Sequence, residues 1–217
     1  MKQYLVIGAG RFGSGIVKEL YTHKCEVVVV DQNEKILDDI EPFTTHAIVG
    51  DLRENDVLDE LVISDFDAVF VAVGTDAFSA ILITKKLTER NAKKIIAKAN
   101  NKEIGEILMS LGADRVIYPE EEAGIKIARQ ELMAGLKEYL EISKNVTAIE
   151  IEVPEQMIGY SLSSLDFSRK YGLTVSFLIR DGEPVFSHFA EIPFQNGDYF
   201  FIIGENTNIN KFKKKFL

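Results

Sequence analysis

The sequence is short of three features, each of which would point to a different class of protein. Only one of its 217 residues is cysteine, so no disulfide can form within the chain and a reducing cytosol is the expected compartment. No apolar run approaches the roughly 18 residues of a membrane-spanning helix, and we see no signal-peptide pattern. The net charge of −9 argues against nucleic acid or an anionic membrane surface as a direct partner.

The sequence also lacks residues suited to a catalytic or metal centre. The three histidines fall at the end of a predicted helix (His23), at the start of a predicted strand (His46) and in the C-terminal third (His188), away from any expected catalytic position. No Cys/His spacing suggests a metal site. We therefore expect no catalytic residues, no metal ligands and no enzymatic reaction.

Apolar runs alternate with amphipathic segments through residues 1–118. The runs predict six strands, at Gln3–Ile7, Glu26–Asp31, His46–Val49, Ala68–Val73, Lys94–Lys98 and Arg115–Tyr118. Several are apolar at consecutive positions, which is typical of parallel strands covered by helices on both faces. Capping signals predict intervening helices at Ser14–Leu20, Glu34–Ile40, Glu54–Leu61, Thr75–Glu89 and Lys102–Leu111. The expected fold class is α/β, a Rossmann-type doubly wound parallel sheet in the order 3-2-1-4-5-6.

Pro119 begins a longer predicted helix, Glu120–Leu140. Its apolar residues recur every three or four positions, at Ile125, Ala128, Leu132, Leu136 and Leu140. This stripe can pack on the chain's own sheet or against a second subunit, and the pattern leaves both open. Residues 119–144 are expected to form a crossover helix and a hinge.

Residues 145–217 change to alternating and short patterns that predict a small α+β domain. The predicted elements are strands at Thr147–Val153, Leu173–Arg180, Pro184–Phe186 and Tyr199–Ile203, and helices at Leu162–Phe167 and Asn206–Phe216. Asp181-Gly182 is a hairpin signal between two of these strands.

A glycine-rich turn, Gly8-Ala9-Gly10-Arg11-Phe12-Gly13, joins the first predicted strand to its helix. In such a loop the first glycine permits a tight turn, the second lets the backbone approach a pyrophosphate, and the third lets the helix pack closely on the strand. Asp31 ends the second strand, where a carboxylate accepts hydrogen bonds from ribose hydroxyls. Because Asp31 would repel a 2′-phosphate and Gln32 follows it, an NADP-type ligand is disfavoured.

Further residues are predicted to reach the same edge of the sheet, namely Asp51, Leu52, Val73, Gly74, Thr75 and Lys98. Together they describe a slot for an adenine nucleotide and its phosphates. Arg11 can contact a terminal phosphate or remain a solvated loop residue, and Lys98 can offset phosphate charge or lie on the surface. Glu120 either helps to bind a divalent cation or only stabilises the positive end of its helix.

These motifs together resemble the RCK/KTN (TrkA/KtrA-type) family of cytosolic regulatory subunits of TrkH/KtrB-type potassium transporters. The resemblance rests on the glycine loop, Asp31, Gly50-Asp51, Ala72-Val73-Gly74 and the phrase LGADRVIYPE at 111–120. In the C-terminal region, Arg169-Lys170-Tyr171-Gly172 and Asn196-Gly197-Asp198 resemble the family's RCK_C (TrkA-C) domain. The glycine loop alone is shared with many dehydrogenases, whereas the phrase at 111–120 and the two-domain layout are more specific.

The resemblance implies a homo-oligomer, a ring of eight subunits built from dimers, that binds ATP, ADP or NAD(H) and acts on an integral-membrane potassium transporter subunit. It implies that Gly8, Gly10, Arg11, Gly13 and Asp31 belong to the nucleotide site. Glu120 would lie near a neighbouring subunit's phosphates, where a divalent cation can take part.

Cyclic di-AMP binds the C-terminal domain of some relatives at a dimer interface, through a position that Arg169 matches. Residues 187–191 depart from the proline-containing segment of those relatives, which argues against cyclic di-AMP as a ligand here.

The predicted function is therefore a cytoplasmic gating subunit, held at the inner face of the membrane by its partner, whose nucleotide shifts the shape of the ring. An NAD-dependent oxidoreductase is the competing hypothesis, and the lack of an acid or base at the expected site weighs against it. A module that serves a different channel is a third possibility.

Overall fold

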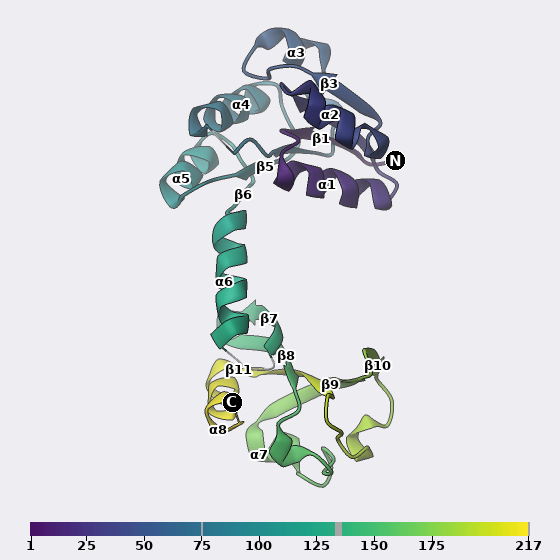
Figure 1. Cartoon of the computed structure of the whole chain (residues 1–217). Coiled ribbons are helices and arrows are strands. Elements are labelled where there is room, and N and C mark those ends of the chain that lie inside the picture. The colour runs from purple at the N-terminus through teal and green to yellow at the C-terminus, as the bar shows by residue number, and fades with distance from the viewer. Residues whose placement is uncertain (75, 133–135, 217) are drawn as a thin grey trace. The chain divides into compact units, whose positions relative to one another are not determined.

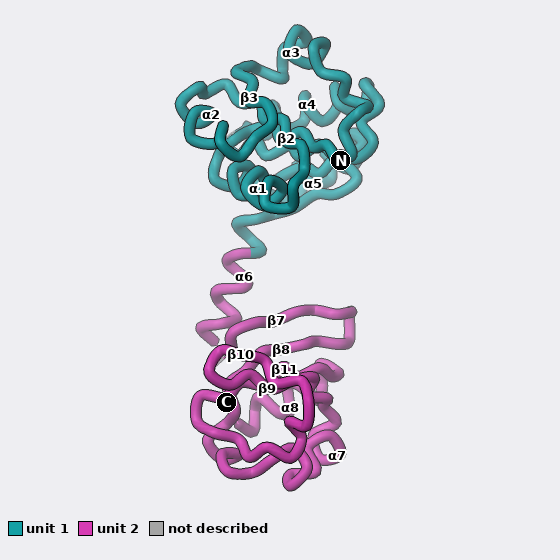
Figure 2. The backbone as a smooth tube through the Cα atoms, turned by 90° about the vertical axis from the view of Figure 1, so that its right-hand side faces the viewer, with its two compact units in different colours: residues 1–122 teal, residues 123–217 magenta. Residues whose placement is uncertain are grey.

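The computed structural model describes residues 1–74, 76–132 and 136–216 of the chain. It divides into two compact units, Met1–Glu122 and Ala123–Leu217, which Figure 2 colours separately. Among the described residues, no helix is both long enough and apolar enough to cross a membrane. Each unit has its own hydrophobic core.

A parallel sheet of six strands forms the centre of the first unit, in the predicted order β3-β2-β1-β4-β5-β6. Its strands are β1 (Gln3–Ile7), β2 (Glu26–Asp31), β3 (His46–Val49), β4 (Ala68–Val71), β5 (Ile95–Lys98) and β6 (Arg115–Ile117). All neighbouring strands pair in parallel. Strand order reverses between β1 and β4, and open sheets of this type bind ligands in the crevice at that point.

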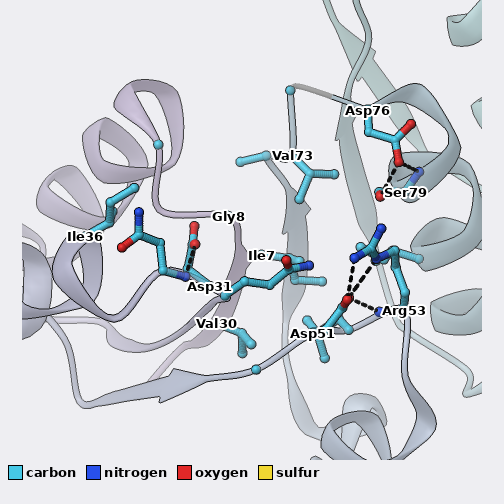
Figure 3. A pocket seen from close by; sticks show the side chains of 18 residues that line it. Ile7, Gly8, Val30, Asp31, Ile36, Asp51, Arg53, Val73, Asp76 and Ser79 are labelled. Carbon is cyan, nitrogen blue, oxygen red and sulfur yellow. Dashed lines mark hydrogen bonds and ion pairs between the residues drawn. The ribbon is translucent and has the colours of Figure 1, made fainter.

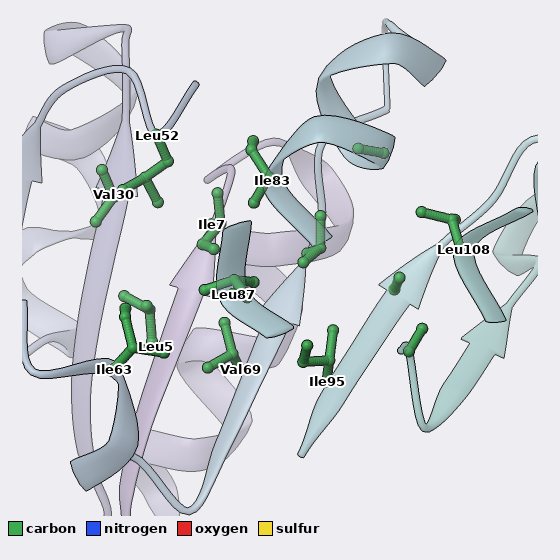
Figure 4. Close-up of a cluster of buried hydrophobic side chains, with 14 of the residues drawn as sticks. Leu5, Ile7, Val30, Leu52, Ile63, Val69, Ile83, Leu87, Ile95 and Leu108 are labelled. Carbon is green, nitrogen blue, oxygen red and sulfur yellow. The ribbon is translucent and has the colours of Figure 1, made fainter. Parts of the chain in front are cut away.

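Helices cover both faces of this sheet (Figure 1). They are α1 (Arg11–Thr22), α2 (Glu34–Ile40), α3 (Asn55–Glu60), α4 (Ala77–Glu89) and α5 (Lys102–Ser110). On the face covered by α1 and α2, Val6 of β1 is buried among Val27 and Val29. On the opposite face, Leu5 and Ile7 are buried with residues of α3, α4 and α5. Figure 4 shows them with Ile83, Leu87 and Leu108. Successive side chains of β1 therefore enter opposite cores, which explains why the run is apolar throughout.

Side-chain caps fix where several helices begin. Asn33 accepts a hydrogen bond from the Lys35 N–H (3.1 Å), and Asn101 accepts one from the Ile104 N–H (2.9 Å). Asp76 caps α4, which therefore begins at Ala77 and not at Thr75 as predicted. Thr75 itself lies outside the described residues.

The second unit contains an antiparallel sheet of five strands in the order β10-β9-β11-β8-β7. Its elements are β7 (Leu136–Ser143), β8 (Val146–Glu152), α7 (Phe167–Tyr171), β9 (Leu173–Arg180), β10 (Glu183–Val185), β11 (Tyr199–Glu205) and α8 (Asn206–Phe216), and α6 (Pro119–Leu132) spans the division between the units. Short 3₁₀ turns lie at Glu41–Phe43, Ile63–Asp65, Glu155–Met157 and Phe189–Glu191. The α+β prediction is confirmed, and Asp181 and Gly182 form the predicted hairpin turn with φ of +53° and +82°.

The predicted helix Glu120–Leu140 is wrong in its second half. α6 ends at Leu132, and Leu136–Ser143 forms β7, which pairs with β8. A spacing of four residues repeats one face of a strand as well as one face of a helix, so Leu136 and Leu140 did not distinguish the two. A bulge between Leu136 and Glu138 then shifts the alternation, so that Leu136 is buried while Leu140 is 54% exposed. The hinge predicted at the end of residues 119–144 is the last part of β7 and the turn into β8.

The predicted helix Leu162–Phe167 is also wrong. Residues 162–166 form turns, and α7 begins at Phe167. Asp166 has a φ of +46°, in the left-handed region, and a right-handed helix cannot continue through such a residue. Ser161 and Ser164 instead exchange hydrogen bonds between side chain and backbone, which stabilises the turn.

Candidate nucleotide-binding site

The loop between β1 and α1 has the shape that its glycines predict. Gly8 has a φ of +94°, and its N–H donates to the Val30 carbonyl at 2.8 Å. A side chain at Gly13 would place its Cβ 1.9 Å from the Gly8 carbonyl oxygen, so only glycine allows this approach of α1 to the loop. A Cβ at Gly10 would meet nothing within 4 Å, so Gly10 faces open space.

The N-terminus of α1 is free to bind an anion. Gly10 is its N-cap, no side chain caps the first turn, and that turn contains no acidic residue. The first N–H groups of a helix have no partner within the helix and carry its positive dipole end. This turn can therefore receive a phosphate, with Gly10 open to the approach.

Asp31 lies beside the glycine loop at the end of β2. One oxygen, Oδ2, accepts the Ala9 N–H at 2.7 Å, and the other, Oδ1, accepts the Asn33 N–H at 2.8 Å. These two bonds fix the carboxylate against both loops, and each oxygen keeps a lone pair for a further donor. The arrangement suits a carboxylate that receives ribose hydroxyls.

A pocket of about 400 Å³ opens next to these residues. Its lining comes from Ile7, Gly8, Gly10, Val30, Asp31, Gln32, Asn33, Ile36, Gly50, Asp51, Leu52, Arg53, Ala72, Val73, Gly74, Asp76, Ser79 and Ile83. Figure 3 shows Asp31 on one side of the pocket and Asp51, Arg53 and Asp76 on the other. The lining belongs to the carboxyl ends of β1, β2, β3 and β4 and the start of α4, which is the crevice expected for the sheet.

Asp51 and Arg53 form an ion pair at the wall formed after β3. The Arg53 Nε donates to both carboxylate oxygens at 2.9 and 3.0 Å, and Nη2 donates to Oδ2 at 2.6 Å. The hydrogen bond from Arg53 holds the pKa of Asp51 below its usual value. The main-chain carbonyl of Arg53 also accepts the Lys86 ammonium group, which joins this loop to α4.

Asp76 is occupied as a helix cap and as a partner of Ser79. Its oxygens accept the N–H groups of Phe78 (3.0 Å) and Ser79 (3.2 Å) and the Ser79 hydroxyl (2.6 Å). These bonds lower the pKa of Asp76, with the Ser79 hydroxyl as the largest cause. The pocket wall opposite Asp31 therefore contains two carboxylates and one guanidinium. At this wall, a neutral part of the ligand that carries hydrogen-bond donors is favoured over a phosphate.

Lys98 lies just outside this lining and pairs with Glu120 at 2.6 Å. The Lys98 side chain is only 10% exposed. Its ammonium nitrogen lies so close to Gly74 that a Cβ on Gly74 would be 3.0 Å from it. Its hydrogen bond lowers the pKa of Glu120, whose side chain is 70% exposed. Lys98 is thus a mostly buried, paired residue and not the solvated surface lysine that the sequence left open.

The predicted site residues divide into three groups. Those that line the pocket are Gly8, Gly10, Asp31, Gln32, Asp51, Leu52, Val73 and Gly74. Those beside it are Ala9, Arg11, Phe12, Gly13, Lys98 and Glu120. Of these, Ala9 contributes its N–H to Asp31, Phe12 packs against the core under α1, and Arg11 is exposed at the first turn of α1. The remaining residue, Thr75, is outside the described residues.

The sequence analysis did not predict Arg53 and Ser79 as lining residues. Arg53 follows Asp51 by two positions, and a short Asp-x-Arg spacing before a helix was the available signal. In the described part of the chain, none of the three histidines lines the pocket, and no three His, Cys, Asp or Glu side chains gather as a metal site would require.

Comparison with known proteins identifies both units. Residues 4–119 match the TrkA-N domain and residues 146–217 the TrkA-C domain. Ktr system potassium uptake protein C of Bacillus subtilis (strain 168) is 32% identical over 216 residues, which span 100% of this chain and 98% of that protein. Ktr system potassium uptake protein A of Vibrio alginolyticus is 31% identical over 213 residues, spanning 98% and 97%.

Solved structures agree with this assignment at the level of the fold. The crystal structure of the GsuK RCK domain is similar with a TM-score of 0.68 and 15% identity, over 99% of this chain and 47% of that one. The chain therefore belongs to the RCK family of paired TrkA-N and TrkA-C domains, and it is a homologue of the Ktr system potassium uptake proteins A and C along its whole length.

Proposed function

We propose that this chain is a nucleotide-binding regulatory subunit of a Ktr-type potassium uptake system. The single observation that carries the proposal is the pairing of Asp31 with the glycine loop at the mouth of the pocket, in a full-length homologue of Ktr proteins. The chain would lie in the cytoplasm and act on an integral-membrane potassium transporter subunit. It would have no reaction to catalyse, since its task is to bind.

The ligand would be an adenine nucleotide, ATP, ADP or NAD(H). The ribose would bind Asp31, the phosphates would lie against Gly10 and the start of α1, and the base would enter between Asp31 and Arg53. Two structural neighbours are described as ligand-bound, a GsuK channel bound to NAD (TM-score 0.63, 15% identity) and a Shewanella denitrificans Kef C-terminal domain in an AMP-bound form (TM-score 0.50, 18% identity). Their fold supports this placement.

Regulation would follow from differential binding. A nucleotide shifts a conformational equilibrium only if it binds one state more tightly than the other. Arg11 is exposed at the first turn of α1, where it would contact the outermost phosphate and so distinguish ATP from ADP. Glu120, largely exposed beside Lys98, would lie near a neighbouring subunit's phosphates together with a divalent cation.

Calorimetric titration of ATP, ADP and NADH tests the site. Asp31→Ala should weaken all three alike, since each carries the adenosine ribose, and the loss of a charge-assisted hydrogen bond should cost about 1.5–3 kcal/mol, roughly ten- to hundredfold in Kd. Asp39→Ala is the matched control, because Asp39 is an exposed aspartate of α2 outside the pocket. Equal affinities in wild type and Asp31→Ala would show that Asp31 does not bind the ribose.

Potassium uptake tests the partner. Cells without their own uptake systems should grow at low potassium when they express a Ktr-type membrane subunit together with this chain, and grow less well with Asp31→Ala. Growth that is unaffected by the chain would contradict the role. Steady oxidation of NADH by the purified chain with a candidate substrate would instead favour an oxidoreductase.

A further inference from the structure

Arg53 occupies the acceptor positions of Asp51 at the wall of the pocket. An ionised carboxylate has about four such positions on its two oxygens. The main-chain N–H of Arg53 (2.8 Å) and its Nε (3.0 Å) donate to Oδ1, while Nε (2.9 Å) and Nη2 (2.6 Å) donate to Oδ2. Asp51 therefore cannot accept the amino group of a base unless Arg53 first moves away.

The guanidinium of Arg53, in contrast, keeps donors for a ligand. This group carries only donors and no acceptor. Asp51 takes the N–H of Nε and one N–H of Nη2, and no acceptor for Nη1 is found among the described residues. Arg53 lines the pocket, and its side chain is 38% exposed. Nη1 and Nη2 thus form a second pair of donors, on the edge of the guanidinium that Asp51 does not contact.

Arg53 is fixed at its main chain as well as at its side chain. Its N–H donates to Asp51, and its carbonyl accepts the Lys86 ammonium group of α4. Figure 3 shows its side chain beside Asp51 on the wall across from Asp31. Because the ion pair holds one edge of the guanidinium, the free edge has a defined position in the pocket.

A pair of donors at this place distinguishes purines by the group at C6. Guanine has two adjacent acceptors, O6 and N7, which one arginine contacts together. Adenine has N7 beside its N6 amino group, which is a donor, so one arm of the guanidinium would meet another donor. On the same wall, Asp76 Oδ1 accepts the Phe78 N–H at 3.0 Å and keeps a lone pair for the N1–H that guanine carries and adenine lacks.

We propose that Arg53 selects the base, and that this pocket binds guanine nucleotides at least as tightly as adenine nucleotides. The inference rests on the proposed function, since it requires a nucleotide in the pocket with its base at this wall. Asp31 and the start of α1 would bind the ribose and the phosphates of either nucleotide alike. Arg53 would favour an oxygen at C6 and would keep Asp51 from favouring an amino group there.

Calorimetric titration of ADP and GDP into the full chain tests the role of Arg53, because these two nucleotides differ only in the base. Wild type should bind GDP as tightly as ADP or more tightly. Arg53→Ala removes the donors and frees Asp51 to accept an amino group, so the ratio of the GDP Kd to the ADP Kd should rise roughly tenfold or more. Arg90→Ala is the matched control, because Arg90 pairs with Asp59 at 2.6 Å outside the pocket, and it should leave the ratio unchanged.

Inosine diphosphate (IDP) identifies the atom that Arg53 contacts. Its base has O6, N7 and the N1–H but no amino group at C2, so IDP should bind like GDP in wild type and weaken with GDP in Arg53→Ala. ADP binding by Arg53→Ala would show that the variant keeps its fold. A ratio that Arg53→Ala leaves unchanged, or IDP that binds like ADP, would overturn the inference.

The wild-type affinities separate this inference from the proposed function without any variant. Wild type that binds ADP roughly tenfold or more tightly than GDP would overturn the selection by Arg53 and leave nucleotide binding in place. Wild type that binds none of ADP, GDP and IDP would contradict the proposed function, and the inference with it.

Discussion

Gly10 and Gly13 are both loop glycines, but the structure gives them different roles. A Cβ at Gly13 would collide with the Gly8 carbonyl oxygen at 1.9 Å, which is backbone and cannot turn away. A Cβ at Gly10 would meet nothing within 4 Å, so the chain alone tolerates it. The need for glycine at position 10 would arise only from the ligand, whose pyrophosphate passes over it.

A pair of alanine substitutions tests this division of roles. Gly13→Ala should lower the free energy of unfolding by about 1–3 kcal/mol or more, as overpacking does. Gly10→Ala should cost less than about 1 kcal/mol, the difference between glycine and alanine at an N-cap, yet weaken nucleotide binding. Chemical denaturation and calorimetry measure the two quantities. A Gly10→Ala protein with unchanged affinity would show that the phosphates do not pass over this residue.

The ion pair between Asp51 and Arg53 gives a prediction about pH. Because Arg53 lowers the pKa of Asp51 from its ordinary value of 3.8, the pair contributes stability that is complete above that value and is lost as pH falls through the lowered pKa. Arg53→Ala should move the Asp51 pKa back toward 3.8. Titration of the Asp51 carboxyl carbon by NMR measures the shift, and identical midpoints in wild type and variant would show that Arg53 is not its cause.

At the scale of elements, a buried ion pair ties β9 to the loop before β11. Asp198 is 1% exposed and receives Arg180 Nε at 2.8 Å, Arg180 Nη2 at 2.6 Å and the Gln195 N–H at 2.8 Å. The Asp198 carbonyl also accepts the Val153 N–H at 2.8 Å. The Asn196-Gly197-Asp198 motif is thus explained by structure: Gly197 turns the chain with a φ of +85°, and Asp198 fastens the turn.

Removing one partner of this pair should be costly. Asp198→Ala leaves the Arg180 guanidinium, 23% exposed, without its carboxylate, and breaking a buried pair in this way costs about 3–5 kcal/mol. Denaturant unfolding followed separately for each unit measures the loss, which should appear in the second unit. Arg180→Met/Asp198→Leu should lose less than Asp198→Ala, because it leaves no unpaired charge. A double variant that is less stable than the single one would contradict this account.

At the scale of the whole molecule, α6 predicts association. Its described residues include none that is buried, and Ile125, Ile127 and Leu132 are 43%, 59% and 82% exposed. Covering one such side chain contributes about 1.5–3 kcal/mol, so a second copy that packed on this helix would form a stable dimer.

Light scattering tests the association. The chain should be an oligomer at micromolar concentration, and Ile125→Glu/Leu132→Glu should lower its mass without loss of helical content, because both side chains are exposed in the single chain. Glu131→Gln, an exposed change on the same helix, is the control and should keep the mass of wild type. A wild-type monomer with and without ATP or ADP would exclude the oligomer.

Much of the fold was predictable because its signals are local. The glycine loop, the Asn33 cap and the consecutive apolar runs each depend on residues within a few positions, and a parallel sheet with short crossovers has few permitted strand orders. The wrong second half of the predicted helix Glu120–Leu140 also results from reliance on local signals. Leu136 and Leu140 at a spacing of four fit a helix and a strand equally. Only pairing with β8, where their partners are Ile151 and Ala148, selected the strand.

The sequence by itself determined the two-part α/β and α+β architecture, the glycine loop and the acid that faces it, because each of these is specified by residue types at short spacing. The tertiary structure decided what those residues meet. It brought Arg53 and Asp76 to the wall of the pocket across from Asp31 and paired Lys98 with Glu120. Such contacts join residues that are far apart in the chain, and their distances depend on how whole helices and strands pack, which no local pattern encodes.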